Sequence, residues 1–381
     1  MLQATIQLVS TAFVPRGELR FYLPSPHVFS LYSSCRTELL PSSKYGIAVP
    51  FLRRLEHSSL RTYDASQANI TVLPALVDWY ARGVCAGSWT DHLRNLTAEA
   101  MRAAEGGPQT PQMIIASDFL SFTRGYVQEI KKMLPGLRVG VYGAEVHMLD
   151  DCMFRTGHLT DVDAIAFRDA ANLKRLQPDP RSMAPRRRSS RPFHVEFAGQ
   201  VDNRTGYRDR YHFFHHDERI RNGSWITTSA PMERSGMRLC NASIPHDRLY
   251  CVIKVTREEM FAVRARGRYS LMLRGDDETS DRVQNAMMAL AVPVVLGQIP
   301  LWLPFHFAVP WHKMIANVSA AAFHSHPAAT LSALPHDVHS KQEQIAKHLH
   351  HFAFWPHRSW LHRNLLTAAL AAPCSASPPR V

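Results

Sequence analysis

A run without Asp, Glu, Lys or Arg extends from Asn285 to Trp311 and limits what this chain can fold into. About twenty apolar residues in a helix span a bilayer, so a membrane-spanning segment has to be considered. We predict instead a buried helix, a buried parallel strand and a Pro-rich loop, because strands covered on both faces are continuously apolar. The run also contains residues that remove or weaken helical hydrogen bonds, at Pro293, Gly297, Pro300, Pro304 and Pro310.

Short apolar segments alternate with amphipathic ones along the chain. Residues 112–117 and 137–143 have the composition of buried strands, and residues 125–134 between them have helical periodicity. Strand–helix–strand order is typical of α/β folds with parallel sheets. The second half repeats the pattern, with strands predicted at 193–199 and 268–275 and a helix at 207–220.

We expect two domains, because a single core rarely serves 381 residues. Residues 178–192 are rich in Pro and Arg and lack apolar periodicity, which predicts a linker. The first domain then covers 1–177 and the second 193–335. Residues 336–381 are predicted to form a C-terminal helix and tail, with an amphipathic helix at 341–355 that packs across both halves.

The chain has 44 Lys and Arg against 32 Asp and Glu, a formal net charge of +12. Most of these basic residues are Arg, whose planar fork of donors binds phosphates and carboxylates. The bias suits a nucleotide, an acidic glycan or a nucleic acid, although a GC-rich genome would also produce it. We expect no nucleic acid as a partner, because no matching aromatic and basic motif accompanies the charge.

Asparagine and cysteine indicate the compartment. Six of the nine Asn residues head an N-x-S/T triplet, which predicts passage through the secretory pathway. In that pathway Cys240 and Cys251 could pair. The six cysteines have no metal-binding spacing. Residues 1–14 lack the basic flank of a signal sequence, so we expect a membrane anchor to be missing from this chain. The triplets begin at Asn69, Asn95, Asn203, Asn222, Asn241 and Asn317.

The segment "RGDDETSDRVQNAMMALAVPVVLG", residues 274–297, is predicted to form a binding site. A helix beginning near Thr279 or Ser280 would have an apolar face and would lie between two strands, with its start at their carboxyl ends. The free N–H groups at a helix start attract phosphate, and Arg274 and Arg282 lie beside it. A nucleotide diphosphate would fit there, provided that some of the acidic residues 276–278 point away.

The residues after position 268 follow a recognisable order. In chain order they include Gly275, Asp276, Ser280, Arg282, Ala286, Pro293, Val294, Leu303, Pro304, Phe305 and Trp311. This order resembles the donor-binding region of exostosin-type glycosyltransferases, glycosyltransferase family 47. Weaker similarities lie at 49–55, 64–74, 114–119 and 197–206. The resemblance implies an α/β, GT-B-like fold of two Rossmann-like domains with a cleft between them.

The resemblance also implies an activity and roles for individual residues. The second domain would bind a nucleotide-diphosphate sugar, with a UDP-sugar expected, and the first a glycan acceptor, usually in the Golgi lumen and without a catalytic metal. Asn285 would hold the ribose, although the family has an acidic residue there and Asn is a weaker acceptor. Leu290 and Ala291 replace a Gly-Cys pair of the family. The remaining donor-binding residues would be Arg274, Gly275, Thr279, Ser280 and Arg282.

The general base that deprotonates the acceptor hydroxyl is predicted in the first domain. Asp118 is our first choice, because it follows an apolar strand at the position of the family's His-Asp pair. The alternative is a helix N-cap role for Asp118. Other candidates are His57, Glu145 and His147.

Two further patterns have simpler interpretations. Asp161 and Asp163 fit the DxD motif that holds Mn²⁺ in another transferase fold, but we interpret them as part of a surface turn. The histidines at 212–218 and 348–352 lack the spacing of a zinc site, so we assign them to helix surfaces.

These observations predict a lumenal glycosyltransferase, an enzyme that moves a sugar from a nucleotide-diphosphate donor to a polysaccharide or glycoprotein glycan. The alternative is a catalytically degenerate glycan-binding or scaffolding protein with the same fold. Either protein could work as a homo- or hetero-oligomer.

Overall fold

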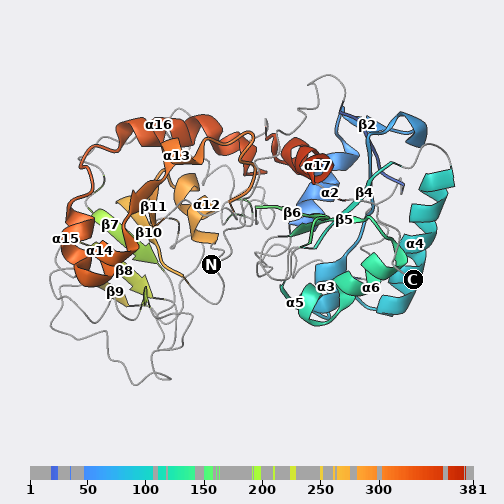
Figure 1. Ribbon diagram of the computed structural model, residues 1–381, viewed down its shortest axis with the longest axis horizontal. Helices are drawn as coiled ribbons and strands as arrows, with labels where there is room; N and C mark the ends of the chain where they lie inside the picture. Colours follow the sequence, from blue (N-terminus) through green and yellow to red (C-terminus); the bar gives the residue numbers. More distant parts are fainter. Residues whose placement is uncertain are drawn as a thin grey trace, which may run out of the picture.

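A computed structural model of the chain describes residues 19–24, 35, 47–105, 110–116, 119–141, 150–157, 160, 163, 191, 193–198, 209–210, 224–228, 249–251, 261, 264–274, 281–297, 303–354, 359–372 and 374. These residues form two α/β lobes, and each lobe is built on a six-stranded parallel sheet (Figure 1). The structure thus confirms the predicted fold class, an α/β, GT-B-like pair of Rossmann-like lobes.

The first lobe contains a sheet with the strand order β2-β1-β3-β4-β5-β6. Every neighbouring pair in it is parallel. Parallel strands need crossover connections, so helices cover the sheet. The strands are β1 (Phe21–Tyr22), β2 (Arg61–Thr62), β3 (Ile70–Val72), β4 (Gln112–Ile115), β5 (Arg138–Val141) and β6 (Met153–Arg155).

Helices cover both faces of this sheet, and the alternation of side chains along β4 shows how. Ile114 packs in a cluster with α3 (Val77–Ala81), α4 (Trp89–Glu105), α5 (Phe119–Thr123) and α6 (Tyr126–Met133). Its neighbours Met113 and Ile115 belong to a second cluster, which includes α2 (Ala48–Glu56) and α17 (Leu361–Ala371). The period of two along β4 therefore feeds two separate apolar layers.

The second lobe contains a sheet with the order β12-β11-β10-β7-β8-β9, also parallel throughout. Its first strand in sequence, β7, lies in the middle beside β10, and the later strands extend from this pair in opposite directions. This is the strand order of a Rossmann sheet. The strands are β7 (Phe193–Ala198), β8 (Ser224–Thr228), β9 (Leu249–Cys251), β10 (Gly267–Met272), β11 (Val292–Leu296) and β12 (Ala316–Val318).

The uncharged run forms the elements predicted for it. Its first part belongs to α12 (Asp281–Met288), its middle is β11, and residues 303–310 form a loop that leads into α13 (Trp311–Met314). Within the described residues, no helix is both long enough and apolar enough to cross a membrane. The C-terminal part continues through α14 (Ala320–Ser325), α15 (Pro327–Ser332), α16 (His339–His348) and the 3₁₀ turn η7 (Leu349–His351).

The end of α12 is held in an unusual conformation. Leu290 has a φ of 53°, in the left-handed region that favours glycine. Its N–H donates to Met287 O, and the next N–H donates to Ala286 O, which is the pattern of a Schellman motif. Leu290 is also the residue that replaces the Gly of the Gly-Cys pair in the exostosin-type sequences that this segment resembles. Two buried side chains hold this turn, because Arg191 donates to Ala289 O and Gln342 to Leu290 O.

The end of the chain returns to the first lobe (Figure 1), where α17 packs against α2, β5 and β6. A disulfide between Cys152 and Cys374 fixes this return, and a second disulfide joins Cys35 to Cys85. The sequence predicted that a helix at 341–355 would pack across both halves, and the helix found there is shorter. The helix there, α16, ends at His348 and packs on α13 and β11, whereas α17 reaches the first lobe.

Two minor predictions were wrong. Asp163 is only 1% exposed and accepts a hydrogen bond from Thr160 Oγ1, so it does not lie in a surface turn. His351 is 8% exposed, and its ring Nδ1 and its backbone oxygen both accept hydrogen bonds from Asn364 Nδ2. It is therefore not part of a helix surface. Cys240 lies outside the described residues, so the predicted Cys240–Cys251 pair stays a prediction. The domain boundaries also stay predictions.

Candidate functional site

The strands β7 and β10 define the place where a ligand is expected in the second lobe. They are hydrogen-bonded neighbours, with Ser270 opposite Glu196. The chain leaves β7 toward β8 and leaves β10 toward β11, on opposite sides of the pair. In sheets of this kind, ligands bind outside the carboxyl ends of the strands at this switch in strand order.

Two arginines meet at the carboxyl ends of these strands. Arg282 Nη1 donates to the carbonyl oxygen of Leu273 at 3.0 Å, and Arg210 donates to the same oxygen from Nε at 3.4 Å and Nη2 at 3.3 Å. Both guanidinium groups also lie over the ring of Phe197, at 5.4 Å for Arg282 and 5.9 Å for Arg210. Leu273 follows β10 and Phe197 lies near the end of β7. We call Arg210 and Arg282 the arginine pair.

Both arginines are buried, with Arg210 3% and Arg282 9% exposed. Arg282 lies at the start of α12, which begins at Asp281 after β10, and Arg210 lies in a helical segment, residues 209–210, that follows β7. A helix start carries free N–H groups and partial positive charge, which adds to the charge of the guanidinium groups. This edge of the sheet is therefore suited to an anionic group such as a diphosphate.

A buried carboxylate lies beneath the arginine pair. Glu196 is fully buried, accepts a hydrogen bond from Ser270 Oγ, and packs against Gly267, where an added Cβ would lie 2.6 Å from Glu196 Cγ. Desolvation raises the pKa of Glu196, while the positive charges of Arg264 and Arg282 oppose this rise. Because a buried guanidinium is more stable beside a carboxylate, Glu196 helps to hold Arg282 at the carboxyl edge.

The first lobe reaches α12 at one described point. An added Cβ on Gly157, which follows β6, would lie 2.1 Å from Gln284 Nε2 on α12. Gln284 is 3% exposed, so the two lobes are in close contact here. The carboxyl end of β6 therefore faces the helix that carries Arg282.

Of the predicted donor-binding residues, three lie within the described part of the chain, and they differ in burial and position. Arg282 lies at the predicted edge, Arg274 is exposed one residue after Leu273, and Asn285 is 2% exposed on the buried helix α12. A ribose contact by Asn285 stays a prediction. Gly275, Thr279 and Ser280 lie outside the described residues.

The predicted acceptor-side base cannot be placed in the same way, because Asp118, Glu145 and His147 lie outside the described residues. His57 is exposed at the end of α2, shortly before β2 begins. It therefore lies toward the amino ends of the strands, away from the edge where the candidate site lies. Among the described residues no group of three or more His, Cys, Asp or Glu could hold a metal ion. The expectation of metal-free chemistry stays a prediction.

Sequence reasoning missed Arg210 and Arg191. Arg210 lies in the segment predicted as a helix, and its place after a strand could have indicated a role like that of Arg282. Arg191 falls in the linker predicted at 178–192, but it is 2% exposed and donates to Gly267 O at 2.6 Å and Ala289 O at 2.8 Å. It thus joins the start of β10 to the end of α12.

No family model matches the sequence, and no curated protein matches it significantly. Among solved structures, the chain is similar to an α,α-trehalose 6-phosphate synthase from Burkholderia multivorans, with a TM-score of 0.40, 12% identity, and coverage of 77% of this chain and 79% of that chain. For a UDP-forming α,α-trehalose-phosphate synthase from Burkholderia vietnamiensis, the TM-score is 0.40, the identity 13% and the coverage 90% and 84%.

The chain is also similar to WaaG, a glycosyltransferase involved in lipopolysaccharide biosynthesis, with a TM-score of 0.35, 10% identity, and coverage of 80% of this chain and 76% of that chain. Scores and identities of this size do not identify an activity. The function of this chain has to be inferred from its own site.

Proposed function

We propose that the protein is a glycosyltransferase that moves a sugar from a nucleotide-diphosphate donor, a UDP-sugar, to a polysaccharide or glycoprotein glycan. One observation carries the proposal: the arginine pair lies at the carboxyl ends of β7 and β10, at the switch in strand order. A diphosphate placed there would accept charge-assisted hydrogen bonds from Arg210 and Arg282. These bonds would also stabilise the charge that develops on the departing nucleotide diphosphate.

We further propose that the enzyme is of the exostosin type, and the order of motif residues in 275–311 supports this assignment. In this assignment Arg274, Gly275, Thr279 and Ser280 add contacts to the donor phosphates. Asn285 contacts the ribose. Asp118 in the first lobe takes the proton of the acceptor hydroxyl as it attacks the anomeric carbon.

The proposal places the protein in the Golgi lumen or at the Golgi membrane. The two disulfides support an oxidising compartment. The exposure of the described Asn residues also supports this compartment. The three that head an N-x-S/T triplet, Asn69, Asn95 and Asn317, are exposed and accessible to glycosylation. The two that do not, Asn285 and Asn364, are 2% and 4% exposed. Mass spectrometry of the secreted or Golgi-purified chain should find glycans on Asn95 and Asn317, and bare asparagine at every triplet would remove this support.

A titration of the purified chain with UDP, GDP and their sugars, followed by thermal shift, tests the donor site. We expect UDP to raise the melting temperature of the wild type and to have little effect on Arg282→Met. Arg266→Met is a matched control. The Arg266 guanidinium lies 4.9 Å from the ring centroid of Phe193, at the amino end of β7, whereas Arg282 lies over Phe197 near the carboxyl end of that strand. Wild-type protein that ignores every nucleotide, or an Arg282 variant that responds normally, would contradict the proposal.

A second candidate function is a glycan-binding or scaffolding protein that kept the fold without the activity. The burial of Arg282 and Asn285 favours it, because buried side chains can serve the fold alone. The same titration separates the two functions, since a scaffold would bind glycan and remain indifferent to nucleotides.

A further inference from the structure

The loop at 303–310, between β11 and α13, is held rigidly. Its two anchors are aromatic, with Phe305 4% and Trp311 2% exposed. Trp311 Nε1 donates to Pro304 O at 2.8 Å, and the N–H groups of Ala308 and Val309 both donate to Phe305 O at 2.9 Å. Phe305 itself has a φ of 58°, a conformation that a bulky residue adopts only when its surroundings impose it.

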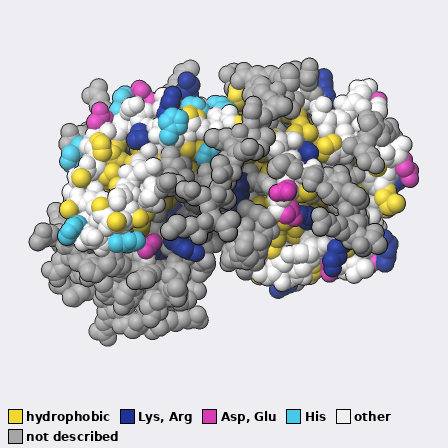
Figure 2. Space-filling view, viewed as in Figure 1, with side chains coloured by type: hydrophobic (Ala, Val, Ile, Leu, Met, Phe, Trp, Pro, Cys, Tyr) yellow, Lys and Arg dark blue, Asp and Glu magenta, His cyan; other side chains and the backbone are white. Residues whose placement is uncertain are grey.

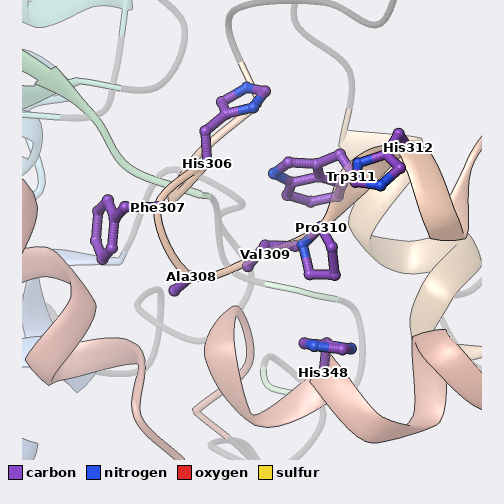
Figure 3. A pocket seen from close by; sticks show the side chains of 8 residues that line it. All are labelled: His306, Phe307, Ala308, Val309, Pro310, Trp311, His312 and His348. Carbon is purple, nitrogen blue, oxygen red and sulfur yellow. The ribbon is translucent and has the colours of Figure 1, made fainter. Parts of the chain in front are cut away.

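This rigid loop presents one aromatic side chain to solvent. Phe307 is 37% exposed and contacts Phe305 edge to face, with ring centroids 6.2 Å apart. It lines an open cavity of about 630 Å³, between the loop and α16 (Figure 3). Cavities of about 300–1,000 Å³ are typical of small-molecule sites. The lining residues are His306, Phe307, Ala308, Val309, Pro310, Trp311, His312 and His348.

Imidazoles supply the polar groups of this cavity. Figure 2 shows histidines gathered over α13 and α16 at the top of the second lobe. His348 Nδ1 lies 2.8 Å from Gln344 O, and because a carbonyl only accepts, Nδ1 carries a proton and the ring orientation is fixed. None of the described lining residues is Asp, Glu, Lys or Arg, so this part of the lining offers no permanent charge to a ligand.

We propose that this cavity binds a segment of a neutral oligosaccharide. The C–H face of a sugar ring is apolar and would stack on Phe307, while its hydroxyl rim would exchange hydrogen bonds with the imidazoles. A charged glycan would gain no ion pair from the described lining, and an extended apolar ligand would leave the imidazoles without hydrogen bonds to the ligand. The rigid loop keeps the entropic cost of binding low.

The cavity adds a second site to the same lobe. The loop comes after β11 in the sequence, and β11 pairs with β10, the strand that Leu273 follows. The binding itself needs none of the donor-site residues. The assignment of the bound segment to the acceptor rests on the proposed function.

The test uses the full chain and two uncharged probes, cellotetraose and xylotetraose, with saturation-transfer NMR and calorimetry at millimolar concentrations. We expect at least one probe to bind, and Phe307→Ala to weaken binding about tenfold or more, which corresponds to ~1.4 kcal/mol. Tyr63→Ala is the matched control, because Tyr63 is an 80% exposed aromatic in the first lobe, and it should bind like wild type. His348→Ala should also weaken binding.

Three results would overturn this inference: no binding of either probe, equal binding by Phe307→Ala and wild type, or affinity that falls steeply with salt. The last result would indicate capture by the Arg-rich surface. A melting temperature for Phe307→Ala equal to that of wild type shows that the variant is folded. Probe binding by a wild-type chain that responds to no nucleotide would uphold the glycan site while the proposed function fails.

Discussion

The arginine pair makes a quantitative prediction through a double-mutant cycle. The variants are Arg210→Met, Arg282→Met and the combination, since Met keeps an apolar stem of similar length and removes the donors. Hydrogen bonds to charged groups contribute about 1.5–3 kcal/mol, so each single variant should weaken UDP binding roughly 10- to 150-fold. Arg282, with the shorter bond to Leu273 O, should show the larger loss.

The combination should lose less than the sum of the two single losses. Both guanidinium groups share Leu273 O and the Phe197 ring, so removal of either one releases the other from the position in which it meets the diphosphate. Groups coupled in this way show interaction energies of about 0.5–3 kcal/mol. Calorimetry of UDP binding to the four proteins at one ionic strength measures the coupling.

Arg266→Met again serves as the control, because it removes the same charge at the other end of β7. Strict additivity of the two losses would show that the arginines act on separate ligands or on none. Equal losses for Arg266→Met and Arg282→Met would show that net charge, and not position, determines the affinity. Either result would refute the placement of the diphosphate at this edge.

Three further predictions concern stability and the contact between the lobes. His92 Nε2 accepts the N–H of Leu76, and desolvation lowers the pKa of His92 to about 4, below its ordinary 6.5. The unfolded chain therefore binds this proton more readily than the folded chain. The free energy of unfolding, measured with urea, should fall by about 1.8 kcal/mol from pH 7 to pH 5 through His92 alone. His92→Gln should lack this part of the pH dependence. Cys374→Ser opens the disulfide that ties α17 to the first lobe and should cost about 2–5 kcal/mol, seen as a lower melting temperature, whereas an unchanged value would mean that the bond does not form. Gly157→Ala should force the Gln284 side chain on α12 to move and should weaken UDP binding slightly, and Gln284→Ala should restore binding by making room. Failure of that rescue would show that the lobes do not meet there.

The sequence was most informative where one physical signal decided the structure. The uncharged run predicted a buried helix, strand and loop because Pro and Gly interrupt a membrane-spanning helix and a strand covered on both faces is continuously apolar, and α12 and β11 confirm it. The position of Arg282 followed from the same pattern, since a helix after a strand begins at the carboxyl edge. Periodicity gave the element type without the exact bounds or partners, so the sequence did not show that α17 packs on the first lobe.

The remaining parts of the site depend on long side chains that meet from distant parts of the chain. Arg210 and Leu273 are 63 residues apart, and Arg191 and Ala289 are 98 apart. No local pattern marks such contacts. A charged residue in a basic, Pro-rich segment is usually solvated, so Arg191 could be recognised as buried only when the start of β10 and the end of α12 were both placed.

The topology of the second lobe explains why the arginines come as a pair. Strands β7 and β10 are parallel neighbours whose chains turn away in opposite directions, so both chains leave the sheet at the same edge. Arg210, in the segment after β7, then meets Arg282, at the start of α12, over Phe197. Burying two guanidinium groups together is costly, and the carbonyl oxygen of Leu273 and the carboxylate of Glu196 compensate part of this cost. The proposed diphosphate would add negative charge at the same edge, where both guanidinium groups already meet.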